Sequence, residues 1–149
     1  MVKPLTVYKA SAGSGKTFTL AVEYIRLVVE NPSCFRNILA VTFTNKATEE
    51  MKMRILSQLY GIHKSLPESD RYLEKERERT GLKDEAIRER AGVALHHLIH
   101  HYHEFRVMTI DTFFQSVLRN LARELDLSPT LHIGLNDYQV EELAVDELI

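Results

Sequence analysis

The stretch Ala10-Ser11-Ala12-Gly13-Ser14-Gly15-Lys16-Thr17 decides the fold of this 149-residue chain. It follows the pattern Gly-x-x-x-x-Gly-Lys-Ser/Thr of a phosphate-binding loop, with Ala10 at the first glycine position. Glycines let the backbone curl so that successive N–H groups point at phosphate oxygens, and the dipole of the following helix attracts an anion. Leu5-Thr6-Val7-Tyr8 has the pattern of a short strand, and helical spacing of apolar residues follows the loop. The loop therefore predicts a nucleotide-phosphate site between a strand and a helix.

Two residues of this loop carry specific roles in the prediction. The Lys16 ammonium group is expected between the β- and γ-phosphates of ATP, and the Thr17 hydroxyl is expected to bind Mg²⁺. Lys16 and Thr17 are thus the predicted catalytic residues. The predicted nucleotide contacts are Ala10, Ser11, Ala12, Gly13, Ser14, Gly15, Lys16 and Thr17. A Gly/Ser-rich turn without a ligand is disfavoured, because Gly-Lys-Thr stands between a strand and a helix.

Strand and helix patterns alternate along the chain. We expect strands at 5–8, 38–41, 106–110 and 131–135, and helices at 17–29, 46–60 (ending at Gly61), 91–102, 111–125 and 136–149. The segment 65–90 is dense in charge of both signs and is expected to be a charged, solvated helical insertion. Such alternation predicts an α/β fold, a parallel sheet flanked by helices, which binds its ligands at the carboxyl ends of the strands.

Composition places few limits on function. With 44% hydrophobic and 27% charged residues, the sequence is typical of a soluble globular protein, and no apolar run is long enough to span a membrane. The single cysteine, Cys34, excludes a disulfide framework, and we expect a cytoplasmic protein without a membrane partner. The net charge of −2 gives no global attraction to nucleic acid, so any DNA contact must come from a local patch.

Two further segments resemble one helicase family. Ala40-Val41-Thr42-Phe43-Thr44-Asn45-Lys46-Ala47, followed by Glu50-Met51 and Arg54, resembles motif Ia of UvrD/Rep-like superfamily 1 helicases. Thr109-Ile110-Asp111-Thr112-Phe113-Phe114 resembles the next motif, which reads Thr-x-His-Ser-Phe in UvrD and Rep. The Asp, the doubled Phe and the Ala at position 10 are similar to the RecB/AddA branch of helicase-nucleases. The resemblance extends from Val7 to about Arg123.

This resemblance implies the first RecA-like motor domain of an ATP-dependent DNA helicase, of the 3′–5′ type and active in DNA repair and recombination. Its partners would be single- and double-stranded DNA, the remaining helicase domains and a companion helicase-nuclease subunit. The two motifs would face DNA, through phosphate contacts from short polar side chains and base stacking on Phe43 and Phe113. The implied DNA-binding residues are Thr42, Phe43, Thr44, Asn45, Thr109, Asp111, Thr112 and Phe113, whereas Phe114 is expected in the core.

The chain also departs from the pattern of that family. No glutamine motif for reading adenine precedes Ala10, and Val145-Asp146-Glu147-Leu148-Ile149 has a helical pattern rather than that of a Walker B strand. We therefore expect residues 1–149 to form the N-terminal part of the motor domain, truncated before Walker B. Such a part would bind ATP without hydrolysing it and would self-associate through an uncovered sheet edge. A small P-loop kinase and a non-catalytic nucleotide-binding module remain alternatives.

Overall fold

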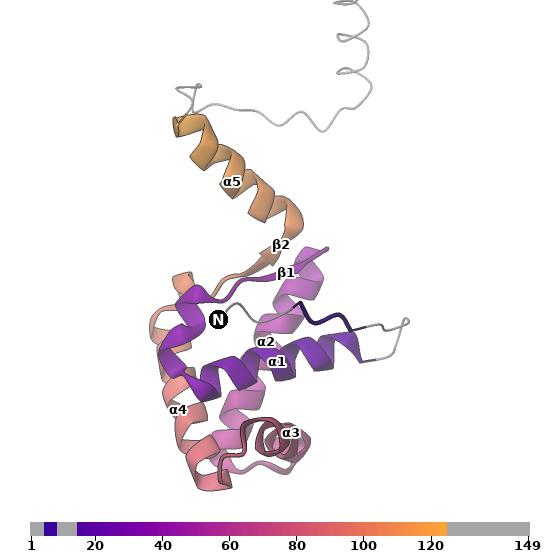
Figure 1. Ribbon diagram of the computed structural model, residues 1–149, viewed down its shortest axis with the longest axis vertical. Helices are drawn as coiled ribbons and strands as arrows, with labels where there is room; N and C mark the ends of the chain where they lie inside the picture. Colours follow the sequence, from indigo (N-terminus) through magenta and orange to yellow (C-terminus); the bar gives the residue numbers. More distant parts are fainter. Residues whose placement is uncertain (1–4, 9–14, 125–149) are drawn as a thin grey trace, which may run out of the picture. The chain divides into compact units, whose positions relative to one another are not determined.

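The computed structural model describes residues 5–8 and 15–124, and the chain divides into two compact units after Ile110. In the first unit the α-helices are α1 (Lys16–Glu30), α2 (Asn45–Lys64), α3 (Asp70–Thr80) and α4 (Asp84–His100). Short 3₁₀ helices cover Pro32–Asn37 (η1), Pro67–Ser69 (η2) and Tyr102–Glu104 (η3). Strands β1 (Ala40–Thr42) and β2 (Val107–Thr109) complete it, and α5 (Ile110–Glu124) leads into the second unit (Figure 1).

The two strands form a parallel pair in which Ala40, Val41 and Thr42 lie opposite Val107, Met108 and Thr109. The described fold is thus mostly helical, with a two-stranded parallel sheet. The strand expected at 5–8 is wrong for this structure, because that extended segment joins no ladder. Leu5 and Val7 are 89% and 70% exposed, and the segment is instead tied to α1, where the Tyr8 hydroxyl donates to the Glu23 carboxylate at 2.8 Å.

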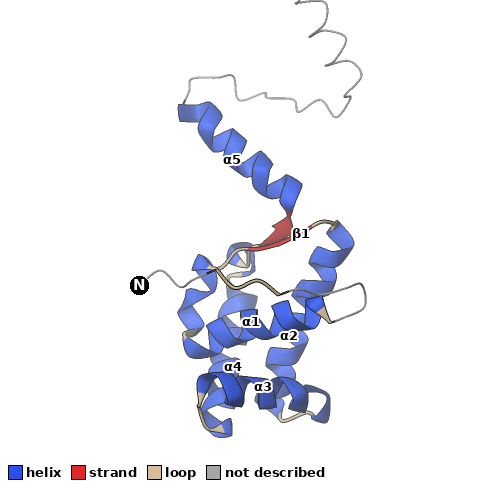
Figure 2. Ribbon diagram, turned by 45° about the vertical axis from the view of Figure 1, so that its right-hand side comes forward, coloured by secondary structure: helices blue, strands red, loops and turns tan. Residues whose placement is uncertain are grey.

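Three helices of the first unit supply most of the core. Each carries apolar residues three or four positions apart, so one face is buried while the other stays polar. The buried faces are Ala21, Val22, Ile25, Val28 and Val29 on α1; Met51, Ile55, Leu59 and Ile62 on α2; and Ile87, Ala91, Ala94 and Leu98 on α4. Figure 2 shows these helices as the bulk of the unit, below the sheet. The N-terminal ends of α1 and α2 are held in place by this core.

Helix α1 ends where the sequence predicts, whereas helix α2 does not. Helix α1 stops at Glu30, and the Asn31 side chain accepts a hydrogen bond from the Ser33 N–H at 3.1 Å. Helix α2, however, does not stop at Gly61 but continues to Lys64 and ends at Ser65, whose φ is 58°. Gly61 serves close packing instead, because a Cβ there would lie 2.8 Å from the Ser69 Cβ. The expected end at Gly61 is therefore wrong.

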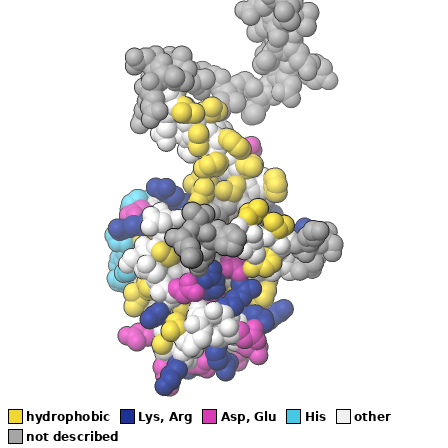
Figure 3. Space-filling model, in the orientation of Figure 1, with side chains coloured by type: hydrophobic (Ala, Val, Ile, Leu, Met, Phe, Trp, Pro, Cys, Tyr) yellow, Lys and Arg dark blue, Asp and Glu magenta, His cyan; other side chains and the backbone are white. Residues whose placement is uncertain are grey.

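The charged segment 65–90 forms η2, α3 and the first turns of α4. Lys, Arg, Asp and Glu side chains are mixed over the lower part of the first unit (Figure 3). Tyr72, Leu73 and Glu76 are nevertheless buried, so α3 contributes to the core as well as to the surface. Within the described residues, no helix has the length and apolar character required to cross a membrane. The strand expected at 131–135 and the helix expected at 136–149 lie outside the described residues.

Candidate nucleotide and DNA site

The described end of the phosphate-binding loop lies at the N-terminus of α1. Gly15 is the N-cap residue and has φ 80°, a left-handed conformation that favours glycine. Lys16 and Thr17 begin the helix and are both exposed, and the Thr19 N–H donates to the Gly15 carbonyl at 2.9 Å. The first N–H groups of a helix have no intrahelical partner, so they suit a phosphate group. The predicted contacts from Ala10 to Ser14 lie outside the described residues.

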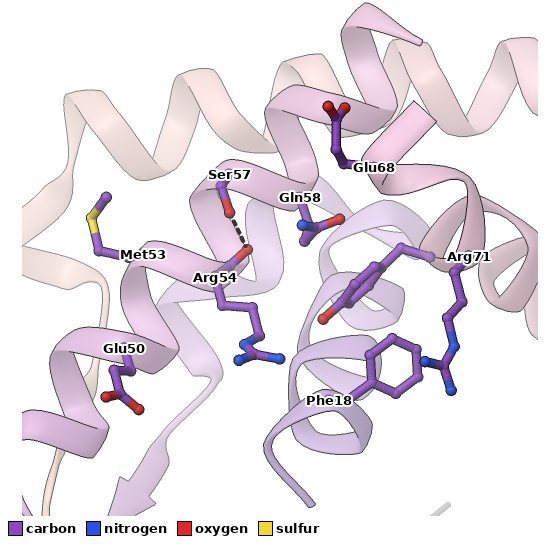
Figure 4. A pocket seen from close by; sticks show the side chains of 9 residues that line it. Phe18, Glu50, Met53, Arg54, Ser57, Gln58, Glu68 and Arg71 are labelled. Atoms are coloured by element: carbon purple, nitrogen blue, oxygen red, sulfur yellow. Dashed lines mark hydrogen bonds between the residues drawn. The ribbon is translucent and has the colours of Figure 1, made fainter. Parts of the chain in front are cut away.

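Phe18, which follows Thr17 on α1, lines a cavity of about 600 Å³. Its lining side chains come from α1, α2, α3 and the intervening η2, and Figure 4 shows them from close by. They are Phe18, Glu50, Met53, Arg54, Ser57, Gln58, Glu68, Arg71 and Tyr72. Small-molecule sites in proteins have volumes of roughly 300–1,000 Å³. The cavity is therefore large enough for a small-molecule ligand.

The walls of this cavity combine flat groups with unpaired polar atoms. The Arg71 guanidinium carbon lies 4.3 Å from the centroid of the Phe18 ring, and the Phe18 and Tyr72 ring centroids are 4.7 Å apart. The Gln58 Oε1 and the Tyr72 hydroxyl are buried and have no hydrogen-bond partner. Sequence reasoning missed Phe18, Gln58 and Arg71 as site residues. Phe18 could have been predicted from the sequence, because it directly follows Thr17 of the loop motif. Arg71 could not, because α3 reaches Phe18 through a tertiary contact that no local sequence pattern indicates.

The second predicted segment follows β1 and begins α2. Thr44 is the N-cap of α2, and its hydroxyl accepts a hydrogen bond from the Ala47 N–H at 3.1 Å. The Thr42 hydroxyl lies 2.7 Å from the Thr48 hydroxyl. The hydroxyls of Thr42 and Thr44, both predicted to contact DNA, thus stabilise the turn between β1 and α2. The sequence did not predict the contribution of Thr48 to this turn. Phe43 is 85% exposed, and Asn45 is exposed in the first turn of α2.

The third predicted segment follows β2. Thr109 is buried and lies opposite Thr42 in the sheet, so β1 and β2 end at the same edge. Asp111, Thr112 and Phe113 lie in the first turns of α5. Helix α5 begins at Ile110, one residue before the expected start. The Asp111 carboxylate therefore lies in the first turn, where the helix dipole favours negative charge.

One expectation for this segment is wrong. Phe114, expected in the core, is 55% exposed, although its ring centroid lies 5.6 Å from that of Phe113. Leu118 and Leu121 of the same helix are also 46% and 45% exposed. The described part of the second unit is this single helix, so within it the apolar face of α5 has no second layer to pack against.

Comparison with known proteins identifies relatives of this chain. Residues 2–147 match the UvrD/REP helicase N-terminal domain. The chain is 33% identical over 127 residues to an ATP-dependent helicase/nuclease subunit of Clostridium beijerinckii, covering 84% of this chain and 8% of that protein. It is 32% identical over 145 residues to the RecBCD enzyme subunit RecB of Mycolicibacterium smegmatis, covering 96% and 13%. No solved structure matches the chain.

A shorter match is closer in sequence. The chain is 52% identical over 52 residues to RecB of Chlamydia muridarum, covering 34% of this chain and 5% of that protein. The chain thus spans between 5% and 13% of the length of these relatives. The predicted resemblance is confirmed, and the family implies a RecA-like P-loop fold and the use of ATP. The chain belongs to the UvrD/REP helicase N-terminal domain family and is a distant homologue of the RecB and AddA helicase-nuclease subunits.

Proposed function

We propose that this chain is the ATP-binding N-terminal part of the first RecA-like motor domain of an ATP-dependent DNA helicase, with 65–90 as a helical insertion in it. One observation carries the proposal: Lys16 and Thr17 are exposed at the N-terminus of α1, where a helix favours phosphate, in a chain whose family implies ATP use. Phe18, the next residue of the same helix, lines a cavity of about 600 Å³. The names of the relatives, helicase/nuclease subunits, agree with a role on DNA.

The proposed ATP site uses residues at the start of α1. Lys16 would pair with the β- and γ-phosphates, and the Thr17 hydroxyl would hold Mg²⁺. The base would enter the cavity beside Phe18. ATP supplies the phosphoanhydride bond whose cleavage drives the motor.

The proposed DNA track lies at the ends of the strands. Phe43 would offer a ring on which a base stacks, and Asn45 and the first amides of α2 would donate to phosphates. Thr109, at the end of β2, would extend the track within the first unit. Asp111, Thr112 and Phe113 belong to the second unit and are proposed as separate DNA contacts of α5. In the complete cytoplasmic enzyme, of 3′–5′ polarity and serving DNA repair, the partners would be the remaining helicase domains and a companion helicase-nuclease subunit.

The test measures ATP and single-stranded DNA binding by the 149-residue chain at low salt. Lys16→Ala should weaken ATP binding about a hundredfold, since hydrogen bonds to charged groups contribute about 1.5–3 kcal/mol. Asn45→Ala should weaken oligonucleotide binding and leave ATP binding unchanged, whereas Asn37→Ala, another exposed asparagine, should change neither. Equal affinities for Asn45→Ala and the parent chain would remove Asn45 from the proposed track.

The same assay separates the alternatives. ADP formation that depends on a small-molecule acceptor would favour a P-loop kinase. ATP binding that depends on Lys16, in a chain without any affinity for single-stranded DNA, would favour a nucleotide-binding module. Neither result is expected, because the β1 end carries the exposed Phe43 and Asn45 rather than an acidic acceptor-binding residue.

A further inference from the structure

Two walls of the cavity that Phe18 lines come from elements outside the three sequence motifs. Gln58 belongs to the second half of α2, and Arg71 and Tyr72 belong to α3. Figure 4 shows Phe18, Gln58 and Arg71 around the same space, with Arg54 reaching into it from α2. A segment that the sequence predicted to be a solvated insertion thus completes a wall of the candidate nucleotide site.

The charges of the cavity fit a neutral ligand group. Arg54 and Arg71 contribute two positive charges, and Glu50 and Glu68 contribute two negative charges. A polyphosphate would be attracted to the two guanidinium groups and repelled by the two carboxylates, so the cavity as a whole offers it little. A neutral heteroaromatic ring has no such conflict, and it stacks on guanidinium planes and on aromatic rings. The Arg71–Phe18 pair, 4.3 Å from guanidinium carbon to ring centroid, is such a stacking wall.

Gln58 can distinguish one base from another. Gln58 lines the cavity, and its Oε1 has no hydrogen-bond partner and almost no accessible surface. The oxygen is an acceptor in need of a donor, and it reaches a ligand in the cavity when the side chain rotates toward it. A carboxamide pairs with the N6 amino group and N7 of adenine, donating with its nitrogen and accepting with its oxygen. The corresponding edge of guanine presents two acceptors, O6 and N7, which would leave the amide oxygen unpaired. The unpaired atom therefore favours adenine over guanine.

We propose that Gln58 and Arg71 determine the base preference of the nucleotide site, with Arg71 stacking on the base and Gln58 selecting adenine. This inference rests on the proposed ATP-binding function. It assigns adenine recognition to α2 and α3. Gln58 and Arg71 are specificity residues in this assignment, whereas Lys16 and Thr17 hold the phosphates.

The experiment titrates the 149-residue chain with ATP, GTP and inorganic tripolyphosphate in the presence of Mg²⁺, using calorimetry. The parent chain is expected to bind ATP about tenfold more tightly than GTP, the size of effect of one bidentate amide contact. Gln58→Leu should bring the ratio close to one. Arg71→Ala should weaken ATP and GTP alike and leave tripolyphosphate unchanged. Arg77→Ala is the matched control, since Arg77 lies on the same helix but does not line the cavity.

The three ligands separate failure of this inference from failure of the proposed function. Tripolyphosphate binding that Lys16→Ala abolishes shows a folded phosphate site, and it serves as the folding control for Gln58→Leu. If that binding is present and both cavity variants keep the ATP-to-GTP ratio and affinities of the parent, the inference is overturned and the proposed function stands. If the cavity variants lose oligonucleotide affinity instead, the cavity belongs to the DNA track and the inference is also overturned. A chain that binds none of the three ligands would refute both.

Discussion

The helical core and the two-stranded sheet of the first unit differ in how completely they are covered. Ile25, Ile55 and Leu98, one from each main helix, are fully buried. In the sheet, Leu39 next to β1 and Val41 within it are 41% and 40% exposed, although parallel sheets are normally buried on both faces. The helices therefore supply most of the stability of this unit, while the sheet presents surfaces for further contacts.

A second cavity, of about 240 Å³, marks the uncovered part of the sheet. It lies between α1 and β1 and is lined largely by apolar side chains. The residues are Leu20, Glu23, Tyr24, Leu27, Ile38, Leu39, Ala40, Val41, Thr42 and Met51. The comparison teaches that stability and function are separable here: substitutions in the helical core should unfold the unit, whereas substitutions at the strand ends should alter binding alone.

The largest effect on stability is expected from a cavity in the helical core. Leu98→Ala on α4 should lower the free energy of unfolding by about 2–5 kcal/mol, because it removes fully buried methyl groups and leaves a void. Val41→Ala in the sheet should cost less than about 1.5 kcal/mol, because that side chain is already part-exposed. Urea unfolding followed by circular dichroism measures both. Equal losses would show that sheet and helices are one equally packed core.

The next largest effect comes from Glu76, a carboxyl group on α3 without any exposed surface and without a hydrogen-bond partner for either oxygen. Burial raises the pKa of Glu76 from 4.5 to about 8, opposed by Arg79 and Arg26 and reinforced by Glu23 and Glu30. The folded state therefore holds a proton that the unfolded chain releases above pH 4.5, so stability falls as the pH rises from 4.5 to about 8.

Glu76→Gln should remove this dependence on pH. At pH 7 the variant is expected to be more stable than the parent by about 3 kcal/mol, with the difference vanishing below pH 4.5. The measurement is urea unfolding at a series of pH values, with Glu74→Gln as an exposed control on the same helix. A difference that stays constant with pH would mean that Glu76 does not bind a proton on folding.

The sequence predicted the local elements of the fold better than their contacts. The Asn31-Pro32 stop of α1 and the helix after Asn45 follow from capping and periodicity, which act within one turn. The role of Gly61 could not be predicted in this way, because it depends on Ser69 reaching the same point from η2. The site divides likewise: Lys16 and Thr17 stand in a local motif, but Arg71 reaches Phe18 only through the packing of α3.

Gly61→Ala gives a smaller effect whose sign is informative. Helix propensity predicts that alanine stabilises α2 by up to about 1 kcal/mol relative to glycine at position 61, in the last turn of the helix. The added Cβ would lie 2.8 Å from the Ser69 Cβ, so packing predicts a loss of about 1–3 kcal/mol instead. Thermal and urea unfolding should show a loss, and Lys64→Ala, in the exposed last turn of α2, should show none. A stabilised Gly61→Ala variant would mean that η2 is free to move away from α2.

The smallest effect on stability is expected for Phe43, at the end of β1. The same residue should have a large effect on DNA binding. Phe43 is 85% exposed, so Phe43→Ala should change the free energy of unfolding by no more than about 0.5 kcal/mol. If a base stacks on this ring, the same substitution should weaken single-stranded DNA binding by about 1–3 kcal/mol. Fluorescence anisotropy of a labelled oligonucleotide at low salt measures the loss.

Two further variants decide how the Phe43 result is interpreted. Tyr60→Ala removes another exposed aromatic ring, 49% exposed and near the opposite end of α2, and should leave DNA affinity unchanged. Phe35→Ala removes a buried ring and should destabilise the helical core by about 3–5 kcal/mol. Retained DNA affinity in Phe43→Ala would remove Phe43 from the proposed DNA track. If Phe43→Ala loses DNA affinity and keeps the stability of the parent chain, the ring contacts DNA. A side chain that does not stabilise the first unit affects binding only through its contact with the ligand.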